Sequence, residues 1–97
     1  MLPFLLKPPA AILEDLGARA KAARLALGWT RKTLAVRSGV PESTIKRFEP
    51  SGLIGTAALI DIAIALDGAE AFEALFAPRP IVSIDDLDKP QRKRGRV

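Results

Sequence analysis

The stretch from Trp29 to Glu49 restricts the possible folds more than any other part of this chain. It reads W-T-R-K-T-L-A-V-R-S-G-V-P-E-S-T-I-K-R-F-E. Thr30 is a good helix N-cap, because its hydroxyl can accept a hydrogen bond from an unpaired N–H of the first turn. Gly39 can adopt the positive φ that ends a helix, which few other residues do. We therefore predict a short helix between these two residues, with Leu34 and Ala35 facing inward.

A second short helix is predicted from Pro41 or Glu42 to Phe48, with Ile45 and Phe48 on its buried side. Two such helices joined by a tight turn are typical of the helix-turn-helix unit, whose second helix enters the major groove of DNA. The alternative is a plain pair of packed helices in a small bundle. Cations on the remaining faces favour DNA, since a surface that meets phosphates needs positive charge. They are Arg31, Lys32, Arg37, Lys46 and Arg47.

The segment T-R-K-T-L-A-V-R-S-G-V-P-E-S-T-I-K-R-F-E resembles the lambda-repressor-like, Xre/Cro-type helix-turn-helix family, and the resemblance extends over roughly residues 12–76. It implies an all-α, lambda-repressor-like five-helix bundle containing a helix-turn-helix. The chain departs from the family pattern at Arg31, where Gln is usual, and at Pro41, where a capping Ser or Thr is usual. We expect Arg31 to keep a phosphate-binding role, and Ser43 or Glu42 to compensate for the cap that Pro41 lacks. In this family the residue corresponding to Glu49 ties neighbouring helices together and does no chemistry.

Three further helices are predicted, over residues 10–27, 56–66 and 69–76, with a loop at 50–52. In the first, apolar residues recur at spacings of three and four, and we expect cations on its other faces. The expected apolar stripe is Leu13, Leu16, Ala20, Ala23 and Leu27, and the expected cations are Arg19, Lys21 and Arg24. We expect Gly28 to stop this helix, Trp29 to pack across its end, and Asp67-Gly68 to end the helix over 56–66.

The length of 97 residues allows one small domain with extensions. We divide the chain into an N-terminal arm (1–9), a DNA-binding domain (10–77) and a flexible basic C-terminal tail (78–97). The arm either packs on the body or on a dimer mate, or is a disordered start. Residues 81–87 fit either a short strand or a helical turn capped by Ser83. The tail has three interpretations: it contacts DNA, docks on an acidic partner protein, or only solubilises the chain.

Charge is distributed unevenly along the sequence. Residues 50–78 contain four acids and no Lys or Arg, whereas residues 30–49 contain five cations and two acids, and residues 89–97 contain five cations and no acid. A molecule with one basic face, a basic tail and an acidic opposite end is suited to meet a polyanion in one orientation. A generally solvated surface, the alternative, would mix the signs.

Enzyme, metal and membrane functions find little support in the residues. The chain has no Cys and no His, which removes thiolate metal sites, the commonest metal ligand and the commonest general base. Its adjacent carboxylate pairs, Glu14-Asp15 and Asp85-Asp86, do not converge on one side of a helix or strand. No phosphate-binding glycine motif or nucleophile elbow is present. We therefore expect no enzyme, no cofactor and no metal, and a cytoplasmic, nucleoid-associated protein without a membrane segment.

The family resemblance assigns contacts with double-stranded DNA residue by residue. At the start of the recognition helix, Arg47 or Lys46 would pair with guanine, Ser43 would bond to several bases, and Glu42 would accept from cytosine. Phosphate contacts would fix the register. The complete set is Glu42, Ser43, Lys46 and Arg47 for bases, and Thr30, Arg31, Lys32 and Thr44 for phosphates.

The last two predicted helices carry more apolar residues than a small monomer needs. A self-complementary patch about a two-fold axis would bury them in a homodimer. The candidate interface residues are Ile60, Ile64, Phe72 and Phe76. The alternative, that they complete the core of the monomer, stays open.

These features together predict a homodimeric, sequence-specific repressor that binds a palindromic operator. The N-terminal extension, the segment F-E-A-L-F (72–76) and the basic tail also resemble HipB-type antitoxins. That resemblance implies autorepression of a toxin–antitoxin operon and binding to a HipA-type serine/threonine kinase toxin. The alternatives are a stand-alone Xre/Cro-type regulator without a toxin, and a protein-interaction adaptor that has lost DNA reading. Lys46 and Arg47 argue against the adaptor.

Overall fold

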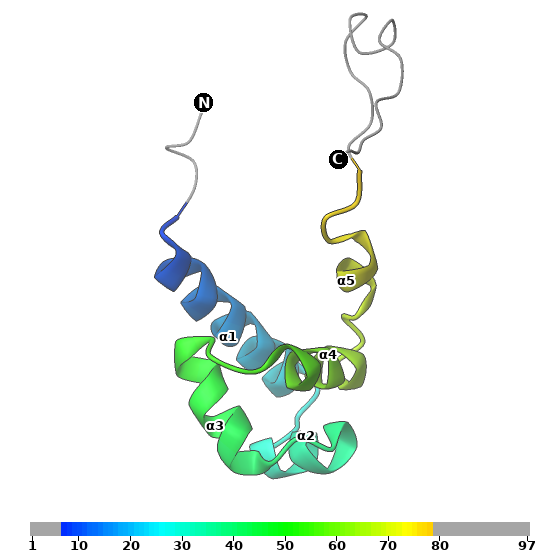
Figure 1. The fold of residues 1–97 in the computed structure, drawn as a ribbon. Helices are drawn as coiled ribbons and strands as arrows, with labels where there is room; N and C mark the ends of the chain where they lie inside the picture. Colours follow the sequence, from blue (N-terminus) through cyan, green and yellow to red (C-terminus); the bar gives the residue numbers. More distant parts are fainter. Residues whose placement is uncertain (1–6, 79–97) are drawn as a thin grey trace, which may run out of the picture.

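The computed structural model describes residues 7–78, and these form a compact all-α domain with no strand among them (Figure 1). Of the expected arm (1–9) only residues 7–9 are described, and of the expected tail (78–97) only residue 78, so the open question of residues 81–87 lies outside the described residues. The helices are α1 (Pro9–Ala26), α2 (Arg31–Ser38), α3 (Glu42–Ser51), α4 (Thr56–Ala65) and α5 (Glu70–Ala74). The all-α prediction is confirmed, with five helices in this part of the chain.

Helix α1 begins at Pro9, whose missing N–H costs nothing in a first turn. The helix ends at Ala26, and the chain turns at Gly28 as expected. Leu27 was predicted to join the buried stripe, but it is 50% exposed because it lies past the last helical turn. The fully buried residues of α1 are instead Gly17 and Arg24.

Helix α2 is capped by Thr30, whose Oγ accepts a hydrogen bond from the Thr33 N–H at 3.0 Å. Replacing Thr30 with Ala should therefore lower the free energy of unfolding by about 1 kcal/mol, because one N–H loses its partner. Thr30→Asp, which keeps an acceptor, should retain most of the stability. Urea unfolding followed by circular dichroism measures both, and equal losses in the two variants would contradict the capping role.

The turn between α2 and α3 depends on Gly39, which adopts φ 76° and donates its N–H to the Ala35 carbonyl at 2.9 Å. Helix α3 then starts after Pro41, which provides no side-chain cap. The side-chain cap expected from Ser43 or Glu42 is not formed, and the Glu42 carboxylate lies in the first turn, at the positive end of the helix dipole.

The predicted loop at 50–52 was wrong, because α3 continues through Pro50 to Ser51 and ends at Gly52 (φ 77°). Proline is tolerated in this last turn because the chain finds other hydrogen bonds there. Ser51 Oγ donates to the Arg47 carbonyl at 2.7 Å, and the Leu53 N–H donates to Ser51 Oγ at 3.0 Å.

The core lies where α1, α2, α3 and α4 meet, and its buried apolar residues come from the centre of the chain. Helix α3 packs against α1 and α2, and α2 also packs against α4 (Figure 1). Buried apolar side chains of this kind each contribute about 1.5–3 kcal/mol relative to exposure. They are Leu34, Val40, Ile45, Phe48 and Ile62, and the predicted inward positions of Leu34, Ile45 and Phe48 are confirmed.

The chain turns after α4 at Asp67-Gly68, as predicted. Asp67, not Gly68, takes the left-handed conformation (φ 61°), and the Gly68 N–H donates to the Ala63 carbonyl at 2.7 Å. Helix α5 is shorter than the predicted 69–76 and ends at Ala74. Phe76 therefore lies beyond the helix, with φ 64° and 93% of its surface exposed.

A helix must have about 20 predominantly apolar residues to cross a lipid bilayer. Within residues 7–78, no single helix is both long and apolar enough to cross a membrane, and only α3 and α4 taken together, bent by 95°, reach the required length and composition.

Candidate nucleic-acid interface

Helix α3 has one face in the core and the other in solvent. Ile45, Phe48 and Glu49 are buried, so the helix cannot rotate without unpacking. The four residues predicted to contact bases are all exposed on the remaining surface. They form two i, i+4 pairs and so share one side of the helix: Glu42 with Lys46, and Ser43 with Arg47. The structure thus brings these four side chains together.

The residues predicted to contact phosphates lie in more varied surroundings. Lys32 is exposed in the first turn of α2, and Thr44 is half-buried in the first turn of α3. Thr30 already uses its hydroxyl oxygen as the cap of α2. A phosphate at this position would therefore meet a hydroxyl that is held in place by the protein.

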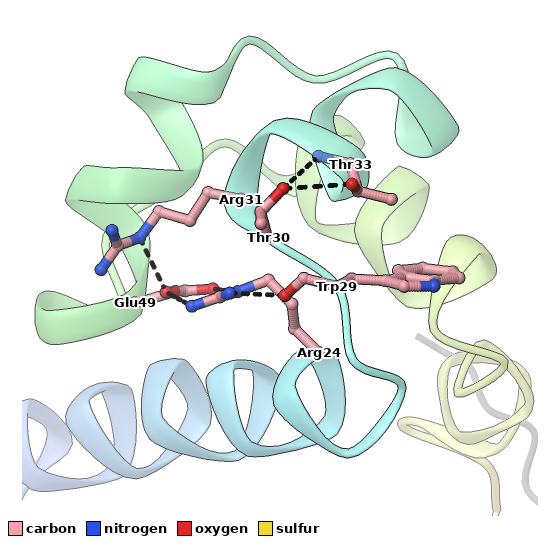
Figure 2. Close-up of polar contacts among 6 residues, drawn as sticks. All are labelled: Arg24, Trp29, Thr30, Arg31, Thr33 and Glu49. Atoms are coloured by element: carbon pink, nitrogen blue, oxygen red, sulfur yellow. Dashed lines mark hydrogen bonds and ion pairs between the residues drawn. The ribbon is translucent and has the colours of Figure 1, made fainter.

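The Arg31 side chain contacts both a buried carboxylate and solvent. Its Nε donates to Glu49 Oε1 at 3.1 Å, while 36% of its side chain remains exposed. Figure 2 shows the rest of the guanidinium pointing away from Glu49. Arg31 is therefore held on one edge by a buried carboxylate and open on the other to an anion.

Glu49 is the centre of this polar network (Figure 2). Its side chain is 1% exposed, and Arg24 approaches it with two donors, Nε to Oε2 at 2.7 Å and Nη2 to Oε1 at 3.0 Å. Arg24 Nη1 also donates to the Trp29 carbonyl at 2.8 Å. Glu49 on α3 thus links α1 and α2 directly and the α1–α2 loop through Arg24, the structural role expected for it.

Arg24 is the main feature that the sequence analysis missed, since it was assigned to the cations on the exposed faces of α1. Its side chain is only 6% exposed and forms the paired hydrogen bonds that a guanidinium makes with a carboxylate. A signal was present in the sequence. Leu13, Gly17, Ala20 and Arg24 recur at spacings of four, three and four, which places Arg24 on the same side of α1 as the glycine that meets α3.

Trp29 is half-buried and packs against the core, as expected. The guanidinium of Arg37 lies over its ring, 4.7 Å from the centroid. This cation–π contact engages one of the five cations that were assigned to the phosphate-facing surface. Of those five cations, Lys32, Lys46 and Arg47 remain without an ion pair or a cation–π contact in the described structure.

The candidate dimer residues lie in two kinds of environment. Ile64 is 61% exposed and Phe76 almost fully so, whereas Ile60 and Phe72 are half-buried. Phe72 lines a groove between α1, α4 and α5 within its own chain. Exposed apolar surface therefore exists at two of the four positions, and the other two already contact the monomer.

The Lys7–Asp15 ion pair lies on the surface of the domain. Lys7 donates a hydrogen bond to the carboxylate of Asp15, which lowers the pKa of Asp15 below its ordinary value. Both side chains are largely exposed, and such a pair stabilises a fold only weakly. Within residues 7–78, no three acidic side chains gather in a way that would hold a metal ion.

Comparison of the sequence with models of known protein families gave no match, and comparison with curated proteins gave no matching relative.

Proposed function

We propose that this chain is a helix-turn-helix protein of the lambda-repressor-like class, which reads double-stranded DNA with α3 in the major groove. More particularly, we propose that it is a homodimeric transcriptional repressor of the kind that serves as a HipB-type antitoxin. The observation that carries the first proposal is the division of α3. Its buried face is fixed by Ile45, Phe48 and Glu49, and its exposed face presents Glu42, Ser43, Lys46 and Arg47.

The chemistry of that exposed face suits base recognition. Arg47 and Lys46 can donate to the O6 and N7 of guanine, and Glu42 can accept from the amino group of cytosine. Lys32, Arg31 and Thr44 lie in the first turns of α2 and α3, where helix N–H groups and positive dipole ends also attract phosphate. Base contacts would specify the sequence, and phosphate contacts would set the register.

The test is binding to the DNA upstream of the protein's own coding region, compared with random DNA at several salt concentrations. A specific repressor should prefer a palindrome there by a factor on the order of a thousand or more. Equal binding to both DNAs, weakening steeply with salt, would show that the surface is only generally basic and would overturn the proposal.

Arg47→Ala should weaken binding to the specific site by about 1–3 kcal/mol and affect random DNA far less. The matched control is Lys32→Ala, which should weaken binding to both DNAs alike and reduce the salt slope by about one. Fluorescence anisotropy titrations of the two variants on both DNAs provide the comparison. An equal loss on both DNAs for Arg47→Ala would make Arg47 a phosphate contact.

A homodimer supports palindrome recognition, because two copies of α3 would then meet two half-sites. The exposed apolar side chains of Ile64 on α4 and of Phe76 after α5 support an interface on this part of the domain. Sedimentation of wild type and of Ile64→Asp would test this interface. An unchanged dimer in the variant would exclude it.

The antitoxin proposal rests on features outside the two DNA-facing helices, namely the N-terminal extension, the segment F-E-A-L-F (72–76) and the basic tail. It implies a HipA-type serine/threonine kinase as partner. Co-purification of such a kinase with the protein from its natural host supports it. An operator footprint with no kinase bound would instead favour the stand-alone Xre/Cro-type regulator.

A further inference from the structure

An apolar groove of about 320 Å³ lies on the side of the domain formed by α1, α4 and α5. Its walls are Leu16, Ala20, Ala23, Leu59, Ala63 and Phe72, with Arg19 at the α1 wall. The groove is many times larger than the share of one water molecule in the liquid, and its walls offer water few hydrogen-bond partners. A groove of this kind favours apolar side chains as occupants.

Charge around the groove restricts what can fill it. The α4–α5 wall is flanked by Asp67 and Glu70, which adjoin the groove-lining residues Gly68 and Ala71. The α1 wall contributes the cation Arg19. A well-matched occupant would therefore carry apolar side chains for the groove, acids that face Arg19, and cations that face Asp67 and Glu70.

We propose that the occupant is the chain's own segment 81–87, bound in cis. That segment reads I-V-S-I-D-D-L and is followed by five cations at residues 89–97. Ile81, Val82, Ile84 and Leu87 supply the apolar side chains. The acids Asp85 and Asp86 complement Arg19, and the following cations complement Asp67 and Glu70.

The position of the segment in the chain makes this binding feasible. The described residues end at Pro78, just after α5, and α5 itself contributes Phe72 to the groove. An extended chain advances about 3.4 Å per residue, so Ile84 can lie up to about 20 Å from Pro78. Because the segment is tethered, binding does not pay the entropy of bringing two molecules together.

This inference goes beyond DNA binding and does not rest on it. It assigns Phe72 to contacts within one chain, and it places the basic tail beside the acidic end of the domain, away from the exposed face of α3. The tail would then not be a second DNA-binding arm in the free protein.

The experiment uses the full chain, which has no cysteine of its own. A nitroxide spin label is attached to the cysteine of the Ser83→Cys variant. The NMR signal intensities of the backbone amides are then compared between samples with the oxidised, paramagnetic label and samples with the reduced label. Signals of Ala20 and Ala63, in opposite walls of the groove, should lose most of their intensity. The signal of Lys46, on the exposed face of α3, should be unchanged.

Three outcomes would overturn the proposal. Loss of intensity that appears only when labelled and unlabelled chains are mixed would place the segment of a second copy in the groove. No loss at Ala20 and Ala63 would leave the groove to another occupant. Loss that persists in Ser83→Cys with Ile84→Asp would show attraction by charge alone. The matched control, Ser83→Cys with Gln91→Asp, should keep the effect, because it adds the same charge outside the apolar segment.

Discussion

Replacing Glu49 with Leu should lower the free energy of unfolding by about 3–5 kcal/mol, because removal of one member of a buried ion pair leaves the other uncompensated. Arg24, whose side chain is 6% exposed, would be left without a carboxylate partner. A folded unit of this size has a total stability of only about 4–11 kcal/mol. The variant should therefore lose a large part of the stability of the domain. Thermal and urea unfolding followed by circular dichroism measure the loss.

Two controls separate the ion pair from general effects of mutation. Arg31→Ala should cost no more than about 1 kcal/mol, since this partner of Glu49 is partly exposed. The double variant Arg24→Met with Glu49→Leu should recover most of the stability, because apolar side chains of similar volume often replace a buried ion pair without loss. If Glu49→Leu cost no more than Arg31→Ala, the network would not be what joins α1 to α3.

Gly17→Ala should destabilise the domain by about 2 kcal/mol or more, although alanine is the better helix former. A Cβ at this position would lie 2.6 Å from the Phe48 carbonyl oxygen and closer still to that of Glu49. Both atoms belong to the backbone of α3, so α1 and α3 would have to move apart. The separation would also lengthen the hydrogen bonds between Arg24 and Glu49.

The matched control for this variant lies on the next residue. Ala18 is exposed on α1, so Ala18→Gly should cost only the helix propensity of glycine, about 0.5–1 kcal/mol. Gly17→Ala should thus lower the free energy of unfolding more than Ala18→Gly does, although alanine is the better helix former. Equal unfolding midpoints for the two variants would contradict close packing of α1 on α3.

Most of the fold could be predicted from the sequence because its signals are local. The Thr30 cap, the left-handed Gly39 and the spacing of Ile45 and Phe48 each depend on a few neighbouring residues, and all are found as expected. The errors occur where local rules conflict. Pro50 normally predicts a helix end, but the Ser51 hydroxyl and Gly52 complete the last turn of α3.

In the candidate site, too, the features that depend on local spacing were predictable and the long-range contacts were not. The shared face of Glu42, Ser43, Lys46 and Arg47 follows from helical spacing, so it was predictable. The partner of Glu49 was not, because Arg24 precedes it by 25 residues and a charged side chain is normally expected in solvent. The contact of Arg37 with Trp29 was missed for a related reason, since it depends on how the α1–α2 loop folds back.

Under the proposed function, the two faces of α3 also bear on how new DNA-binding specificities arise. Ile45, Phe48 and Glu49 hold the helix in the core, whereas Glu42, Ser43, Lys46 and Arg47 are exposed. Exposed substitutions of this kind usually change stability by less than about 0.5 kcal/mol. A gene duplicate can therefore change all four exposed residues in succession while every intermediate still folds. Under the proposed function, the mutations that alter the DNA target would thus be separate from those that unfold the domain.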